Sequence, residues 1–259
     1  MQSSLLLKNT LSTRKRKFRF TMSFFDTLHR SVASTLSLSV CSFCNVAKTK
    51  TGICDDCLSA ISSTEPSCPR CANQLDKHNK INDEPTQCGR CLTKPPVYNA
   101  VISATRYQYP VDKALSELKF NRQLHYARSL THILNEKVKR HYTNSPYPQA
   151  IVAIPLHPKR LLERGFNQSE VIAKHLSKSL AIPKANALTR IKDTPHQIGL
   201  SEKQRRKNLT NAFYLAQTLP PHIALIDDVV TTGSTITEAA KLCLKQGVKK
   251  IDVWCLAKT

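Results

Sequence analysis

The feature that most constrains the fold of this chain is the segment of residues 223–235, near the C-terminal end. Residues 223–226 are apolar, which is typical of a buried strand, and the carboxylates of Asp227 and Asp228 follow at its end. A short hydroxyl-rich turn with one glycine comes next, and a helical pattern begins after it. Backbone N–H groups in such a turn point at an anion, and the dipole of the following helix adds positive charge. The segment therefore predicts a strand, a phosphate-binding turn and a helix.

Two further features of this segment indicate its ligand. The chain has only six glycines in 259 residues, so Gly233 in the turn indicates a backbone that must bend tightly beside its ligand. A pair of carboxylates one turn away from a phosphate suits the vicinal hydroxyls of a ribose, or a Mg²⁺ ion held beside them. The alternative is an ordinary strand and helix with a solvated pair of aspartates.

The whole segment resembles the signature with which type I phosphoribosyltransferases bind 5-phosphoribosyl-1-pyrophosphate (PRPP): four hydrophobics, two acids and a Thr-rich loop. The resemblance implies that Asp227 and Asp228 meet the ribose 2′ and 3′ hydroxyls, with Mg²⁺ accompanying PRPP. It also implies that the loop holds the 5′-phosphate. The loop residues are Thr231, Thr232, Gly233, Ser234 and Thr235.

Eight of the ten cysteines form four pairs with two residues inside each pair. The pairs are Cys41 and Cys44, Cys54 and Cys57, Cys68 and Cys71, and Cys88 and Cys91. Two such pairs supply the tetrahedral thiolate set that Zn²⁺ prefers, so we expect two zinc ribbons. Pairs that follow each other in sequence are expected to share an ion, and interleaved pairing is the alternative. Disulfides are disfavoured because no secretion signal is visible, whereas iron is not excluded.

Both zinc ions are expected to be structural, because four cysteine ligands leave no open coordination position for catalysis. A docking surface for a partner is the other role considered. Two Zn²⁺ and eight thiolates also make residues 41–97 net acidic, which argues against this segment as the main nucleic-acid contact. Cys243 and Cys255 lie in apolar stretches apart from the pairs and are expected in the core.

Beyond Pro95 and Pro96 the cysteine pairs stop, and strand and helix patterns alternate. Apolar runs predict strands at residues 98–107, 150–156, 223–228 and 251–256, and amphipathic patterns predict helices at residues 110–120, 124–141, 167–180 and 235–246. Such alternation favours a parallel, doubly wound sheet whose ligands bind at the carboxyl ends of the strands.

The expected fold class is therefore α/β. The resemblance makes it a type I phosphoribosyltransferase-like parallel sheet with an N-terminal double zinc-ribbon module. We expect the ribbons in residues 41–97 and the sheet in residues 98–259, after a basic tail and a short helix in residues 1–40.

One polar loop, residues 157–168, follows the strand expected at 150–156. It concentrates the cations Lys159, Arg160 and Arg164 at the end of that strand. In a phosphoribosyltransferase the pyrophosphate-binding loop belongs here, and the two arginines are natural ligands for an anion. A solvated loop without a ligand is the alternative.

A second polar loop, residues 190–208, is marked by proline and glycine. Its composition suits a mobile lid over bound phosphates, and we assign Arg190, Gln197 and Arg205 to that lid. As for the first loop, a merely solvated loop is the alternative.

The chain carries a formal charge of +21, of which residues 98–259 hold +14. A surplus of this size favours a polyanion, and PRPP alone is too small to need it. The cluster Lys203, Arg205, Arg206 and Lys207 is the first candidate for a nucleic-acid contact. A merely solvated basic surface is the alternative. No apolar run is long enough for a membrane span.

The first 21 residues are basic, contain no acid and read like a tail or a transit peptide. Met22 begins a more plausible sequence, because apolar residues at helical spacing follow it and lead to Cys41. Residues 1–21 are therefore expected to be a mis-called start or a disordered tail, and the choice between Met1 and Met22 as the start stays open.

Taken in order, these pieces resemble the ComF family, which includes the competence protein ComFC and GntX. The resemblance covers residues 41–259 and rests on short motifs in both halves of the chain. Besides the cysteine pairs, they are Cys88-Gly-Arg-Cys91 before Lys94-Pro-Pro, Leu118-Lys119-Phe120, Pro155-Leu156, Arg164-Gly-Phe-Asn-Gln168, Thr194-x₂-Gln197-x₂-Leu200, Arg206-x-Asn208, Ala212-Phe213 and the segment from Asp227 to Thr235.

The ComF resemblance implies a cytoplasmic protein of natural transformation that binds PRPP and handles single-stranded DNA during DNA uptake. DNA-uptake helicase or channel proteins at the inner membrane are the implied partners. The alternative is an active PRPP-dependent phosphoribosyltransferase in nucleotide metabolism. No segment is recognisable as a purine, pyrimidine or glutamine site, so the sequence names no acceptor.

Overall fold

The structure is a computed structural model that describes residues 39–62, 66–75, 80–81, 84–193 and 209–259. All of these residues belong to one compact unit, Ser39–Thr259. Several predictions lie outside the described residues. They concern the basic tail, the helix expected before Cys41, the lid residues Gln197 and Arg205, and the cationic cluster at residues 203–207.

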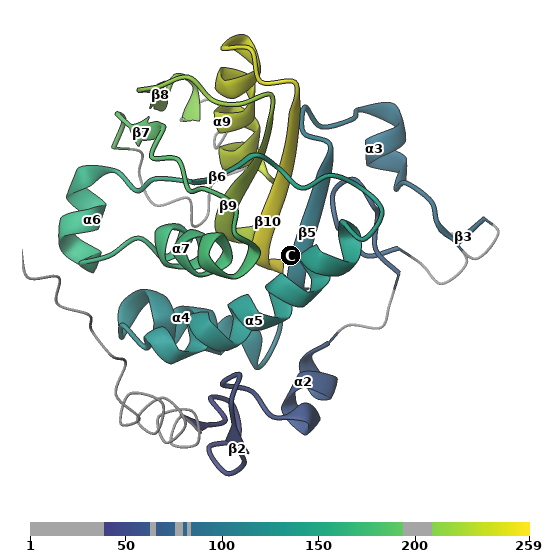
Figure 1. The fold of residues 1–259 in the computed structure, drawn as a ribbon, viewed down its shortest axis with the longest axis vertical. Coiled ribbons are helices and arrows are strands. Elements are labelled where there is room, and N and C mark those ends of the chain that lie inside the picture. The colour runs from purple at the N-terminus through teal and green to yellow at the C-terminus, as the bar shows by residue number, and fades with distance from the viewer. Residues whose placement is uncertain (1–38, 63–65, 76–79, 82–83, 194–208) are drawn as a thin grey trace, which may run out of the picture. The chain divides into compact units, whose positions relative to one another are not determined.

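The centre of the fold is a four-stranded parallel sheet in the order β5-β10-β9-β6 (Figure 1). Its strands are β5 (Ala100–Arg106), β6 (Ala150–Ala153), β9 (His222–Val230) and β10 (Lys250–Lys258). The two central strands, β9 and β10, are almost wholly buried. They read as near-continuous apolar runs because both faces of a parallel sheet are covered.

Helices cover the two faces of the sheet unequally (Figure 1). One face packs against α4 (Val111–Phe120), α5 (Leu124–His141) and α7 (Gln168–Leu180), and the other against α9 (Ser234–Lys245). Neighbouring residues of β10 therefore enter different cores. Trp254 packs in the cluster that contains Leu130 of α5, and Val253 packs in the cluster that contains Ile236 of α9. This is the alternation expected of a strand.

Two smaller features of this part were not predicted. The loop after β6 contains a helix of about two turns, α6 (Pro158–Arg164), and β7 (Leu188–Arg190) pairs antiparallel with β8 (Phe213–Leu215). None of the residues of α6 is buried, so no apolar stripe marks it in the sequence. Its ends are set by local groups instead, with His157 accepting a hydrogen bond from Lys159 N and Gly165 in the left-handed conformation.

The cysteine-rich region is built from short elements around the two four-cysteine groups. Its elements are β1 (Ser39–Val40), β2 (Lys48–Thr49), α2 (Asp55–Ile61), β3 (Lys80–Ile81), β4 (Glu84–Pro85) and α3 (Gly89–Thr93). The strands pair antiparallel, β1 with β2 and β3 with β4. The fold class is thus confirmed: an α/β parallel sheet follows two four-cysteine groups.

Buried polar contacts join the first cysteine group to α5. Ser129 Oγ donates a hydrogen bond of 2.8 Å to the carbonyl of Gly52, and it lies 2.8 Å from Ser42 Oγ. Gly52 has φ 85°, and a Cβ there would lie 2.6 Å from Ser129 Oγ, so only glycine fits. Both cysteine groups and the sheet lie in the same compact unit, and a domain boundary at residue 97 stays a prediction.

Candidate functional site

The two aspartates lie at the carboxyl end of β9, where its apolar run stops. Asp227 Oδ1 accepts hydrogen bonds from Ser169 Oγ at 3.1 Å and from the backbone N–H of Asp228 at 3.0 Å. Asp228 Oδ2 lies 3.0 Å from Lys119 Nζ at the end of α4. Helices α4 and α7 thus each provide one polar partner for the acid pair.

The acid pair holds more negative charge than its neighbours neutralise. Burial, and next the adjacent Asp228 carboxylate, raise the pKa of Asp227 to about 7, and Lys119 only partly opposes this. A carboxylate with such a pKa gains from a further cation or hydrogen-bond donor. Mg²⁺ and ribose hydroxyls are ligands of this kind.

The turn after β9 has the geometry that the sequence predicts. Gly233 adopts φ 75° and is the N-cap of α9, and a Cβ there would lie 3.2 Å from Tyr98 Oη. Thr232 Oγ1 and Ser234 Oγ lie 2.8 Å apart, and Lys258 Nζ donates to the carbonyl of Thr231 at 3.0 Å. The first turn of α9, which includes Thr235, contains no acidic residue, so its N–H groups and dipole favour an anion.

The three cations predicted in the pyrophosphate loop lie on α6, and Arg164 and Lys159 contact residues outside that helix. Arg164 Nη1 donates to Gln168 Oε1 at 2.9 Å, and its guanidinium lies 5.9 Å from the centre of the Phe120 ring. Burial lowers the pKa of Arg164, and the Asp228 carboxylate opposes that shift. Lys159 Nζ lies 3.6 Å from Asp193 Oδ2.

Arg190, assigned to the lid, ends strand β7 and is buried. Its guanidinium lies 5.7 Å from the centre of the Phe213 ring on β8. Burial and then the charge of Arg160 lower the pKa of Arg190, whereas Asp227 raises it. Arg190 is therefore within electrostatic reach of both Asp227 and Arg160.

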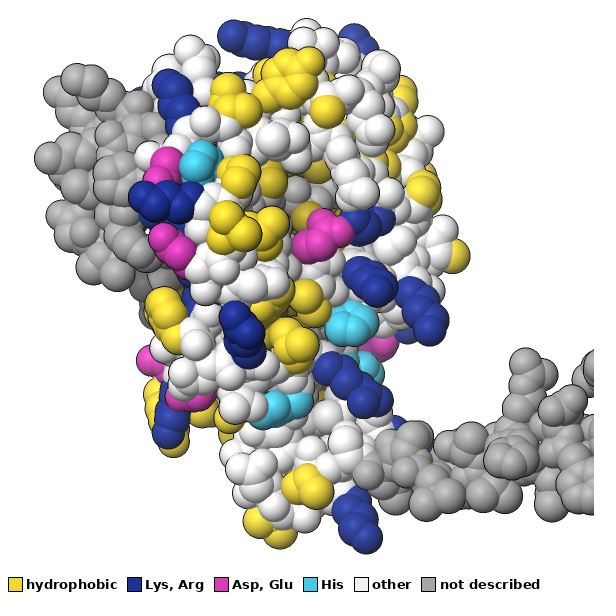
Figure 2. Space-filling view, turned by 90° about the vertical axis from the view of Figure 1, so that its left-hand side faces the viewer, with side chains coloured by type: hydrophobic (Ala, Val, Ile, Leu, Met, Phe, Trp, Pro, Cys, Tyr) yellow, Lys and Arg dark blue, Asp and Glu magenta, His cyan; other side chains and the backbone are white. Residues whose placement is uncertain are grey.

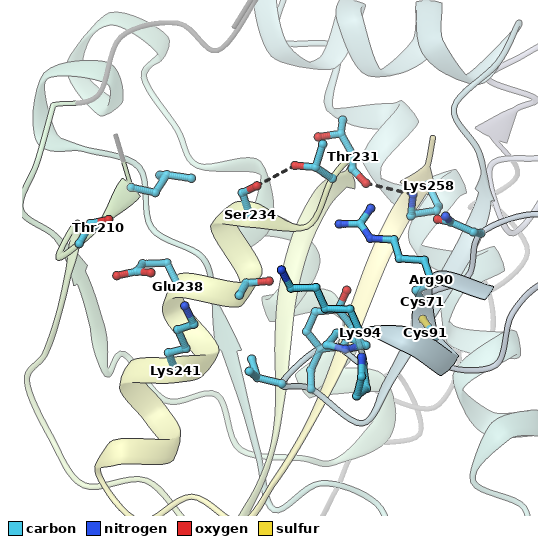
Figure 3. Close-up of a pocket in the computed structure, with 18 residues that line it drawn as sticks. Cys71, Arg90, Cys91, Lys94, Thr210, Thr231, Ser234, Glu238, Lys241 and Lys258 are labelled. Carbon is cyan, nitrogen blue, oxygen red and sulfur yellow. Dashed lines mark hydrogen bonds between the residues drawn. The ribbon is translucent and has the colours of Figure 1, made fainter. Parts of the chain in front are cut away.

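A cavity of about 340 Å³ lies beside the loop, between α9 and residues 90–98. Thr231 and Ser234 line it, whereas Asp227 and Asp228 are not among its lining residues. Figure 3 shows Arg90 and Lys94 reaching towards α9 from the second cysteine group. Sequence reasoning missed this cavity, because it joins residues more than a hundred positions apart.

The sulfurs of the eight paired cysteines form two groups, and within each group all sulfurs lie within 4.8 Å of one another. One group contains Cys41, Cys44, Cys54 and Cys57, and the other contains Cys68, Cys71, Cys88 and Cys91. The sequential pairing is thereby confirmed over the interleaved one.

The geometry of both groups fits a tetrahedral Zn²⁺ site. A Zn–S bond of about 2.3 Å places tetrahedral sulfurs about 3.8 Å apart. The sulfurs of Cys44 and Cys54 are 3.9 Å apart, and those of Cys71 and Cys88 are 3.6 Å apart. In each group the third cysteine donates its backbone N–H to the sulfur of the first, at 3.4 Å. Such bonds stabilise thiolates, which are the form that binds a metal.

Three curated relatives align with most of the chain. It is 37% identical over 212 residues to the DNA utilization protein YhgH of Salmonella typhi, covering 80% of this chain and 91% of that protein. It is 36% identical over 221 residues to competence protein F of Haemophilus influenzae, covering 83% and 93%. The chain belongs to the ComF family. The competence protein ComFC of Streptococcus pneumoniae is a more distant ComF relative, 26% identical over 211 residues, covering 80% and 87%.

No family model matches the chain. Among solved structures, it overlaps with a purine phosphoribosyltransferase from Pyrococcus horikoshii at 20% identity and a TM-score of 0.30, over 50% of this chain and 70% of that one. An adenine phosphoribosyltransferase from Leishmania donovani overlaps at 15% identity and a TM-score of 0.25, over 49% and 64%.

Three of the motifs that carry the ComF resemblance meet at the acid pair. Lys119 of the Leu-Lys-Phe motif pairs with Asp228, while the next residue, Phe120, lies under Arg164. Arg164 and Gln168 are the two ends of the Arg-Gly-Phe-Asn-Gln motif, and they hydrogen bond to each other. Motifs that are far apart in the sequence thus surround one site.

A second polar group of this ComF-family chain was not predicted. His222 Nε2 lies 2.7 Å from Asp252 Oδ2, to which Tyr142 Oη donates at 2.6 Å. The group lies at the start of β9 and β10, at the opposite end of the sheet from Asp227. Through Asp252 of β10, these hydrogen bonds join the C-terminal end of α5 to the sheet. Cys243 and Cys255 are fully buried, as predicted.

Proposed function

We propose that the chain binds PRPP with Mg²⁺ at the carboxyl end of β9 and handles single-stranded DNA during natural transformation. The observation that carries the first half is the placement of a charged, partly uncompensated acid pair directly before a left-handed glycine turn and a helix N-terminus. Ribose hydroxyls and a phosphate are separated by a few bonds in PRPP, and they match these two neighbouring features.

In this proposal each part of PRPP has its own group of residues. Asp227 and Asp228 hold the ribose hydroxyls, and the turn from Thr231 to Thr235 holds the 5′-phosphate. Arg160, Arg164 and Lys159 stabilise the pyrophosphate, since cations at the end of β6 lie next to β9 in the sheet. Arg190, Gln197 and Arg205 form the lid.

The acid pair also explains where Mg²⁺ would act. Lys119 is the cation beside Asp228 in the ligand-free protein, and it neutralises only part of the charge of the pair. Mg²⁺ brought in with PRPP would supply the missing charge, through the carboxylate oxygens that it prefers. Ser169 keeps Asp227 oriented towards the site.

The DNA half of the proposal is supported by the family and by charge. Relatives are called DNA utilization and competence proteins, and residues 98–259 of this chain carry +14. On the face shown in Figure 2, Lys and Arg side chains are scattered among apolar and acidic ones. We infer a cytoplasmic role beside DNA-uptake helicase or channel proteins of the inner membrane. Among the described residues, no helix is long and apolar enough to cross a membrane.

We also propose that both cysteine groups hold structural Zn²⁺. The support is the all-thiolate donor set and sulfur separations close to those of a tetrahedral site. The metal would hold the short elements of the cysteine-rich region together, because they bury little apolar surface of their own.

The alternative function is an active phosphoribosyltransferase of nucleotide metabolism. The intact acid pair and the arginines near it favour this reading, because they could stabilise a departing pyrophosphate. Turnover separates the two functions. Isotope-labelled PRPP is incubated with the full chain, Mg²⁺ and candidate acceptors, and the variant Asp227→Asn, Asp228→Asn is the control. An enzyme releases more pyrophosphate than this control, whereas a binding protein does not.

The proposed function is tested by the melting temperature of the full chain with and without PRPP and Mg²⁺. A ligand that binds only the native state raises the melting temperature by an amount that grows with the logarithm of its concentration relative to Kd. PRPP is expected to raise the melting temperature, and ribose 5-phosphate is expected to raise it much less. An unchanged melting temperature at millimolar PRPP would contradict the proposal.

A further inference from the structure

A groove of about 470 Å³ runs along β5, which is an edge strand of the central sheet. One wall is the C-terminal half of α5, which contributes Lys137 and Arg140. The other wall is the loop of the second cysteine group from Ser67 to Ala72. Arg106, at the carboxyl end of β5, also lines the groove. The sheet and the cysteine-rich region therefore enclose it together.

The charge of this groove is of one sign. Arg106, Lys137 and Arg140 line it, and no aspartate or glutamate does so among the described residues. Burial, and then the charge of Arg140, lower the pKa of Lys137, and Arg106 lowers it further. The three cations thus repel one another, and this repulsion destabilises the ligand-free protein. An anion bound in the groove would reduce this repulsion.

Lys258 lines both this groove and the cavity beside the loop after β9, and its Nζ donates to the carbonyl of Thr231 at 3.0 Å. Lys258 therefore has a partner within the protein. Lys137 and Arg140 extend from α5. Arg140 Nε donates to the carbonyl of Glu136, and no aspartate or glutamate of the described residues lines the groove to neutralise either charge.

We propose that this groove binds the phosphate backbone of a single nucleic-acid strand. The inference rests on the DNA half of the proposed function and names its surface. A duplex receives protein elements into its own grooves, whereas a single strand enters a positively charged groove of the protein. The second cysteine group does not need to be basic for this role. It forms a wall, while the cations come from the basic residues 98–259.

The proposal is tested with a fluorescently labelled single strand of thymidines and the metal-loaded full chain. The variant Lys137→Glu, Arg140→Glu reverses the charge of one wall and leaves Arg106, which donates to Gln74 Oε1, in place. The control Lys174→Glu, Lys178→Glu makes the same change in net charge on the exposed surface of α7. Fluorescence anisotropy gives Kd between 50 and 200 mM salt. Melting temperature and metal content confirm that each variant is folded.

The groove variant is expected to bind at least about tenfold more weakly than wild type, with a log–log salt slope smaller by about 1.4 for two lost phosphate contacts. The control is expected to stay within about twofold of wild type. Equal losses in both variants would show that only net charge matters, and this would overturn the proposal. Competition by polyglutamate as strong as that by unlabelled strand would also overturn it, in favour of an acidic peptide.

Two further results keep this inference separate from the proposed function. If wild type binds no single strand at 150 mM salt, the DNA half of the proposed function fails together with the groove. If wild type binds and the groove variant binds equally well, only the groove is wrong. A neutral variant, Lys137→Gln, Arg140→Gln, replaces the first one if charge reversal prevents folding, and an at least threefold loss is then expected.

Discussion

Lys119 Nζ lies 3.0 Å from Asp228 Oδ2, and the neighbouring Asp227 Oδ1 accepts hydrogen bonds from Ser169 Oγ and from the backbone N–H of Asp228. One ammonium group thus faces two adjacent carboxylates at the end of β9. The imbalance agrees with the pKa of Asp227, which burial and Asp228 raise to about 7. The ligand-free site is therefore destabilised by its own charge, which a bound cation would relieve.

The first prediction follows from this pKa. An aspartate has a pKa of about 3.9 in the unfolded chain, so between pH 4 and 7 the native state keeps a proton that the unfolded state has lost. The contribution of Asp227 to the free energy of unfolding therefore falls as the pH rises from 4 to 7. Asp227→Asn is expected to raise the melting temperature of the ligand-free protein at pH 8 and to change it little at pH 4. If the melting temperatures of Asp227→Asn and wild type differ by the same amount at pH 4 and at pH 8, the account is contradicted.

The second prediction concerns Gly233. Replacing it by alanine places a Cβ at positive φ and 3.2 Å from Tyr98 Oη, so the loop must shift. We expect a loss of about 1 kcal/mol in stability and a PRPP affinity at least about tenfold lower. Gly247→Ala is the control, because Gly247 has φ 97° and no atom lies within 4 Å of the position that a Cβ would take. It is expected to lose similar stability and to keep its PRPP affinity; weaker PRPP binding in both variants would argue against a specific role for the loop.

The third prediction concerns the metals. Purified full chain is expected to contain two zinc ions, and Cys44→Ser or Cys88→Ser to contain one, because each cysteine belongs to a different four-sulfur group. Cys243→Ala is the control, since this buried cysteine lies in the core and its loss should leave both ions in place. Metal analysis by mass spectrometry measures the ratio. Fewer than about one and a half equivalents in wild type would contradict two zinc sites.

The fourth prediction is about stability at the other end of the sheet. Tyr142→Phe removes the hydrogen bond to the buried Asp252 carboxylate, and this is expected to cost about 1–3 kcal/mol. Tyr147→Phe is the control, because the ring of Tyr147 packs beside that of Tyr142 but is more exposed. Urea denaturation gives both free energies of unfolding. Equal effects would show that the hydroxyl of Tyr142 contributes nothing specific.

Local patterns in the sequence predicted most of the sheet. The helix at residues 124–141 was predicted with its observed bounds, and the strands that became β9 and β10 were predicted within three residues at either end. Both strands are buried on two faces, which gives long apolar runs, and the helices have one apolar side. The cysteine pairing could also be predicted, since ligands close in sequence reach one ion most easily.

What the sequence could not show depends on contacts over long distances. Helix α6 is held by its caps and buries none of its residues, so no periodicity marks it. The partners Lys119 and Asp228 are over a hundred residues apart, as are Tyr142 and Asp252. Neither pair could be found without the topology that brings their strands and helices together. The same holds for the groove between Arg140 and the second cysteine group.

The central claim is that the end of β9 binds PRPP, and calorimetric titration of the full chain with PRPP and Mg²⁺ tests it most directly. Wild type is expected to bind one PRPP per chain, and Asp227→Asn with Asp228→Asn to bind at least about a hundredfold more weakly, because hydrogen bonds to charged groups are worth about 1.5–3 kcal/mol each. Asp55→Asn with Asp56→Asn is the matched control, an adjacent and exposed pair at the start of α2 that should leave binding unchanged. Equal PRPP affinity in wild type and in the Asp227, Asp228 variant would contradict the account.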